Sequence, residues 1–100
     1  SKPVPVVQPA PAIPDVLLQD AIAAYDRAEY DVAIAMLERR RMQVGEARDV
    51  TMLRGWALHN ARRSADAHKL FRALHQAEPT EATRSAIYHT RRTARVRRWL

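Results

Sequence analysis

Two stretches of this chain repeat each other at a spacing of 34 residues. Residues 15–37 read DVLLQDAIAAYDRAEYDVAIAML, and residues 49–71 read DVTMLRGWALHNARRSADAHKLF. The identical pairs are Asp15 and Asp49, Val16 and Val50, Ala23 and Ala57, and Ala33 and Ala67. A fixed period of this length is typical of stacked helix–turn–helix units, because one unit alone cannot bury its apolar face. The period therefore predicts an all-α fold of antiparallel helix pairs.

The residues in and around the repeat favour helix. No proline lies between Asp15 and Glu78, and this stretch is rich in Ala, Leu, Arg and Glu, which have high helix propensity. Asp15 and Asp31 are expected to cap the first two helices, and Gly45 to end the second after the arginines at 39–41 in its last turn. The expected helices begin near residues 15, 31, 49, 64 or 65 and 80, and the last reaches about residue 98.

The segment before the first helix has a different composition. Residues 1–14 hold five of the six prolines, and such density predicts an extended linker that joins this domain to something upstream. A ligand segment for another module is the alternative. Residues 15–100 are expected to form one helical domain, with repeats at about 14–47 and 48–81 and a final helix at about 80–98.

Composition narrows the chemistry and leaves the compartment open. The chain has no cysteine, which excludes disulfides, a thiolate nucleophile and a cysteine-based zinc site. No apolar run approaches a membrane span and no signal peptide is visible, so the cytoplasm and the periplasm both remain open. Arginine outnumbers lysine by 15 to 2 and alanine is common, a bias that suggests a bacterial source.

At this point the chain resembles the tetratricopeptide repeat (TPR) family. Its repeats have 34 residues, with small residues in the first helix that pack against a small and a large residue of the second. The matching small positions are Ala21 and Gly55 in the first helices and Ala33 and Ala67 in the second. Leu37 and Phe71 match the large apolar position, Tyr30 matches the aromatic before the second helix, and Pro79 matches the closing proline. The resemblance implies an α-solenoid, with the final helix covering its end.

The chain departs from the family pattern at several positions. The early aromatic of the first helix is replaced by Leu17 and Thr51, and the next leucine position holds Asp20 and Arg54. Two repeats are also fewer than the roughly three that an independent array needs. The fifth helix is expected to supply the missing burial, unless the chain is part of a longer solenoid or self-associates.

The resemblance also implies a binding surface, because first helices of successive TPR repeats line a concave groove. The corresponding positions here are Leu18, Ile22, Tyr25, Asp26, Met52, Trp56, His59 and Asn60. An apolar and aromatic wall of this kind suits an amphipathic helix or an extended apolar segment of a partner protein. Core positions for Tyr25 and Trp56 are the alternative. Leu18 and Ile22 stand where charged TPR clamps hold a partner's terminal carboxylate, so we expect no preference for acidic C-termini.

The net charge of +6 is concentrated at the C-terminal end. From residue 82 onward there is no acid, and six arginines form a basic patch: Arg84, Arg91, Arg92, Arg95, Arg97 and Arg98. A solvated helix face is the simplest interpretation. An acidic protein partner, nucleic acid and an anionic membrane surface are the alternatives.

Catalytic signals are weak. His68 and His75 are seven residues apart, but no third ligand stands at metal-binding spacing, and no motif of a hydrolase, metalloprotease or nucleotide-binding loop is present. We expect no enzymatic activity, no cofactor and no metal. The sequence predicts a non-catalytic protein-interaction module or scaffold, for which family analogy suggests a bacterial secretion, pilus or exopolysaccharide assembly. Nucleic-acid or anionic-surface binding through the basic patch is the alternative function.

Overall fold

The computed structural model describes the backbone of residues 15–99 and the side chains of residues 15–91. Within this range the chain forms five α-helices and no strand: α1 (Val16–Asp26), α2 (Tyr30–Val44), α3 (Arg48–Asn60), α4 (Ser64–Ala77) and α5 (Glu81–Trp99). The predicted all-α class is therefore confirmed. The proline-rich linker predicted at 1–14 lies outside the described residues.

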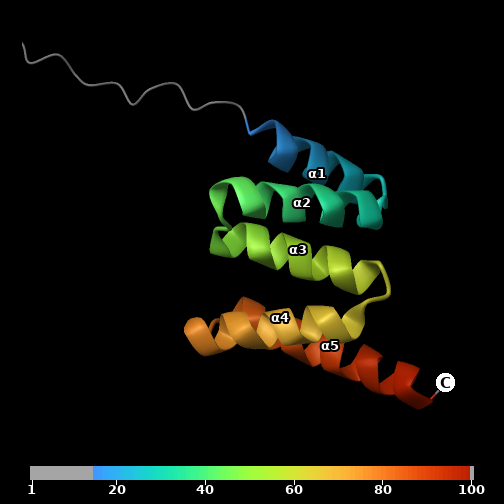
Figure 1. The fold of residues 1–100 in the computed structure, drawn as a ribbon. Helices are drawn as coiled ribbons and strands as arrows, with labels where there is room; N and C mark the ends of the chain where they lie inside the picture. Colours follow the sequence, from blue (N-terminus) through green and yellow to red (C-terminus); the bar gives the residue numbers. More distant parts are fainter. Residues whose placement is uncertain (1–14, 100) are drawn as a thin grey trace, which may run out of the picture.

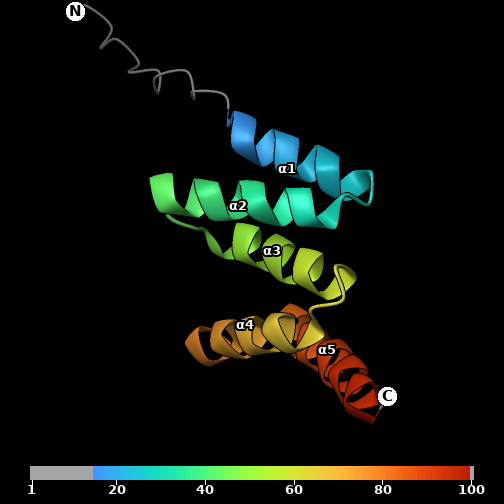
Figure 2. The ribbon, with the colours of Figure 1, turned by 45° about the vertical axis from the view of Figure 1, so that its right-hand side comes forward.

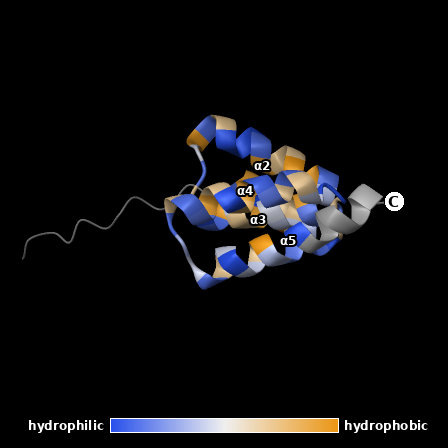
Figure 3. Ribbon diagram, turned by 90° about the horizontal axis from the view of Figure 1, so that it is seen from below, coloured by the Kyte–Doolittle hydropathy of each residue, from blue (hydrophilic) through white to orange (hydrophobic). Residues whose placement is uncertain are grey.

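The helices are stacked in chain order. Each packs mainly against the next along the sequence, and Figures 1 and 2 both show α5 beside α4 at the end of the stack. Seen along the stack, α2 and α5 lie on opposite sides of α3 and α4 (Figure 3). Short connections make sequential helices antiparallel, as their lengths predict.

The helix ends follow the expected signals in part. The Asp15 carboxylate accepts a hydrogen bond from the Leu18 backbone N–H at 3.1 Å, which confirms it as the first cap. Gly45 ends α2 with φ of 77°, a backbone conformation that favours glycine. The expectation for Asp31 was wrong, because α2 begins one residue earlier and Asp31 lies in its first turn. Of the three arginines at 39–41, only Arg41 is in the last turn.

The two hairpins close with the same turn. Ala28 and Arg62 both have positive φ, 61° and 67°, at positions 34 residues apart. The N–H of Glu29 donates to the Ala24 carbonyl, and the N–H of Arg63 donates to the Leu58 carbonyl, each at 2.8 Å. The repeat seen in the sequence is therefore also a repeat of backbone geometry.

Close packing at the small residues explains how the hairpins hold together. A Cβ on Gly55 would lie 2.5 Å from Phe71 Cζ, so α3 and α4 approach each other only because this position has no side chain. Phe71 is fully buried in a cluster with Ile34, Ala57 and Leu58. Around Ala21, a second cluster contains Leu37 and Val50.

Arg54, at the position where the family pattern has leucine, is buried as an ion pair. Its guanidinium donates to both carboxylate oxygens of Glu46 at 2.8 Å and to Glu38 at 3.1 Å. Burial alone would raise the pKa of Glu46, but the hydrogen bonds from Arg54 and Thr51 outweigh it and lower that pKa. The charged residue is accommodated because both of its partners come from the neighbouring helix and loop.

Candidate partner-binding surface

The eight residues predicted to bind a partner lie on α1 and α3, and we call them the α1/α3 face: Leu18, Ile22, Tyr25, Asp26, Met52, Trp56, His59 and Asn60. One contact joins its two halves. The Asn60 side-chain amide donates to the Tyr25 hydroxyl at 2.9 Å, although the residues are 35 positions apart. The ends of α1 and α3 that carry Tyr25 and Asn60 therefore lie side by side.

The α1/α3 face is only partly open to solvent. Ile22, with 43% of its surface exposed, is its most accessible apolar residue, and Asp26 and Asn60 are also exposed. The others are half-buried. Leu18 packs against the Ala21 cluster, whereas Tyr25, Met52 and Trp56 pack against the Phe71 cluster. These side chains belong to the core on one side and remain accessible on the other.

Trp56 is the centre of an aromatic group that extends to α5. Its ring centroid lies 5.8 Å from His59, 5.1 Å from Phe71 and 6.3 Å from His89. Contacts of this geometry stabilise aromatic pairs beyond their buried area. His89 was missed by the sequence prediction, because only tertiary packing shows which residues of α5 reach α3.

The polar groups of the α1/α3 face are engaged in the fold. Burial, with a smaller effect of the neighbouring Tyr30, raises the pKa of Tyr25, so its hydroxyl keeps its proton at neutral pH. The Tyr25 and Tyr30 rings meet edge to face with centroids 5.3 Å apart. His59 Nδ1 lies 3.0 Å from Ser64 Oγ. The face therefore offers oriented hydrogen-bonding groups but no group with a pKa moved toward acid–base chemistry near neutral pH.

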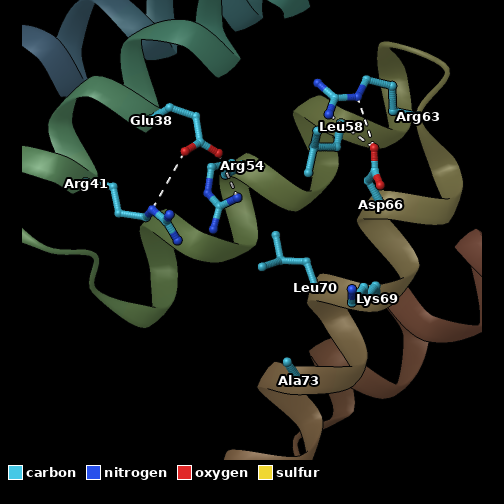
Figure 4. A pocket seen from close by; sticks show the side chains of 9 residues that line it. All are labelled: Glu38, Arg41, Arg54, Leu58, Arg63, Asp66, Lys69, Leu70 and Ala73. Carbon is cyan, nitrogen blue, oxygen red and sulfur yellow. Dashed lines mark hydrogen bonds and ion pairs between the residues drawn. The ribbon is translucent and has the colours of Figure 1, made fainter.

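A pocket of about 340 Å³ lies between α2, α3 and α4, away from the predicted site (Figure 4). Glu38, Arg41 and Arg54 line one side, and Arg63 and Asp66 line another. Glu38 contacts Arg54 at 3.1 Å and Arg41 at 3.7 Å, and Asp66 contacts Arg63 at 3.1 Å. Apart from Lys69, the charges around this pocket are thus paired with one another.

The predicted basic patch is described only in part. Arg84 and Arg91 are exposed on α5, whereas the side chains of Arg92, Arg95, Arg97 and Arg98 lie outside the described residues. In the described part of the chain, no helix is long and apolar enough to cross a membrane. Nor do three or more acidic or histidine side chains there gather into a group that would hold a metal ion.

The two histidines spaced by seven residues lie against α5. His68 Nδ1 is 3.1 Å from Thr90 Oγ1, and His75 Nδ1 is 2.7 Å from Thr83 Oγ1. The threonines are also seven residues apart and fully buried. The matching intervals indicate that these pairs set the register of α4 against α5.

No family model matches the chain, and searches of curated proteins and of solved structures found no significant match. The resemblance to the TPR family therefore rests on the residues quoted above.

Proposed function

We propose that this protein is a non-catalytic, TPR-like interaction module that holds a partner protein on the α1/α3 face. The observation that supports this most is the joining of α1 and α3 through Tyr25 and Asn60. This contact places the exposed Ile22 and the half-buried Trp56 on helices that are tied together. The surface is therefore formed before any partner arrives.

The proposed partner is an amphipathic helix or an extended apolar segment. Ile22, Met52 and Trp56 offer apolar and aromatic contact area, while Asp26 and Asn60 offer polar groups at one end. A preformed surface binds more tightly than a flexible one, because less conformational entropy is lost on association. Burial of a large aromatic such as Trp56 typically contributes much of the energy in such interfaces.

Salt dependence separates this function from the alternative. Apolar contacts persist at high ionic strength, whereas binding of nucleic acid or an anionic surface through the basic patch falls steeply as salt displaces the bound phosphates. The same protein captured at low and high salt therefore reports which surface is used.

The experiment is a nuclease-treated pull-down at both salt concentrations with Ile22→Glu and Val32→Glu. Ile22 and Val32 are both 43% exposed, but Val32 lies on α2, outside the proposed surface. A protein retained at high salt by the wild type and by Val32→Glu, and lost with Ile22→Glu, supports the proposal. Equal behaviour of the two variants, or capture abolished by salt, overturns it. Circular dichroism must show both variants folded.

A further inference from the structure

Two adjoining pockets on the α4/α5 pair gather basic side chains. A pocket of about 400 Å³ is lined by His68 and Arg72 of α4 and by Ile87 and Arg91 of α5. A second, of about 350 Å³, shares His68 and Arg72 and adds Lys69, Ala73 and Gln76. No carboxylate lines either one. Figure 2 shows the two helices side by side.

These cations differ from those elsewhere in the fold. Arg27, Arg40, Arg48, Arg54 and Arg63 each contact a carboxylate. Among the described residues, Arg72 and Arg91 have no such partner. The nearest acids in the sequence do not change this, because Asp66 is paired with Arg63 and Glu81 begins α5 ten residues before Arg91. The two guanidinium groups are left available for an anion that the chain itself does not supply.

His68 is oriented beside these arginines by α5. The Thr90 hydroxyl donates to the Ala86 carbonyl at 2.8 Å, so its lone pair is free to accept from the Nδ1–H of His68 at 3.1 Å. This network assigns the proton to Nδ1 of the neutral ring. Burial, then the positive charge of Arg72 and Arg91, lowers the pKa of His68. The pocket is thus positively charged enough to disfavour a further proton.

We propose that the pocket between α4 and α5 binds a dianionic phosphate group, held by Arg72 and Arg91 with His68 at its side. Guanidinium groups match phosphate oxygens with two parallel hydrogen bonds, which a single-atom anion such as chloride does not accept. A bound dianion also relieves the repulsion between the two arginines. Ile87 supplies an apolar wall that reduces competition from water.

The test follows the His68 imidazole by nuclear magnetic resonance while inorganic phosphate is added at constant ionic strength. Saturable shifts at His68 and a higher pKa for this residue in phosphate than in sodium chloride are expected, because an anion favours the charged imidazole. Shifts that do not saturate, or that sodium chloride reproduces, overturn the proposal.

Three variants localise the site. Arg72→Gln and Arg91→Gln should each weaken phosphate binding by about tenfold, the usual effect of losing hydrogen bonds to a charged group. Arg84→Gln removes the same charge from α5 outside the pocket lining and should change the affinity by no more than about twofold. If Arg84→Gln weakens binding as much as Arg91→Gln, diffuse charge is responsible and the pocket is not a site.

Three forms of phosphate distinguish the source. Phenyl phosphate binding more tightly than inorganic phosphate indicates a phosphorylated organic molecule, whose ring covers Ile87, and equal affinities indicate free phosphate. Both results support a dianion site. Diphenyl phosphate, a singly charged diester like the nucleic-acid backbone, should bind least. If it binds best, the proposed dianion specificity is wrong. The site lies outside the α1/α3 face, so this test is independent of the proposed partner-binding function.

Discussion

Single residues in the two hairpin turns store strain that glycine would release. Ala28, with φ of 61°, occupies the left-handed region, which costs an alanine about 1 kcal/mol. Ala28→Gly should therefore raise the free energy of unfolding by several tenths of a kcal/mol, and up to about 1 kcal/mol. The measurement is urea denaturation followed by circular dichroism.

The control for this substitution changes the same residue type on a regular helix. Ala35 is exposed in the middle of α2, where Ala→Gly should lower the free energy of unfolding by about 1 kcal/mol. Opposite signs for Ala28→Gly and Ala35→Gly are expected. If both variants are destabilised, the strain at Ala28 is too small to matter.

The Arg54 ion pair offers a second prediction at this scale. Arg54→Leu restores the residue type of the family pattern but leaves Glu46 without its partner, and the side chains of Arg54 and Glu46 are both only 9% exposed. Breaking a buried pair typically costs about 3 kcal/mol or more. We expect Arg54→Leu to lose stability of this order in urea denaturation, and Arg54→Leu/Glu46→Gln to recover part of it. An Arg54→Leu variant as stable as the wild type would show that Glu46 simply turns into solvent.

Helix pairs show what the sequence could and could not predict. The 34-residue repeat correctly predicted the α1–α2 and α3–α4 hairpins, because identical spacing produces the same turn twice. The start of α2 was displaced because Ala28 adopts a left-handed conformation that only glycine would have signalled. The α4/α5 pocket was missed because the register of two helices depends on tertiary packing. The equal seven-residue intervals of His68–His75 and Thr83–Thr90 were a usable signal, visible only when both helices were compared.

The α4/α5 pair should also make stability depend on pH. Burial, followed by Arg72 and Arg91, lowers the pKa of His68 below 6.5 in the folded protein, whereas the unfolded chain binds a proton near pH 6.5. Unfolding therefore takes up a proton between these two values, so the free energy of unfolding falls as the pH drops through 6.5 and levels off below the folded pKa. At pH 7.5 this loss is absent.

The check is denaturation at pH 7.5 and 5.5 in wild type and His68→Gln. The other three histidines and the carboxylates are the same in both proteins, so the difference between their pH dependences belongs to His68. The wild type should lose more stability on acidification than the variant. Identical losses would contradict the lowered pKa.

The whole molecule behaves as a stack in which each helix depends mainly on its neighbours. The two internal helices α3 and α4 contribute the large buried residues Leu58 and Phe71, whereas α1 buries only Ala21 and Ala24. In such quasi-one-dimensional folds, stability is the sum of local terms and of contacts between adjacent units. The end of the stack at α1 should therefore open before its centre.

Native-state hydrogen exchange tests this order. Amides of α1 should exchange first and those of α3 and α4 last, because opening α1 breaks contacts with α2 and leaves the Phe71 cluster intact. Arg40 holds α1 to α2 through Asp15, with Nη2 and Oδ2 2.7 Å apart. Arg40→Gln should accelerate exchange in α1 alone, whereas Arg39→Gln, at the exposed neighbouring position, should change little. Uniform protection from α1 to α4, lost in one step, would show that the stack unfolds as a single cooperative unit.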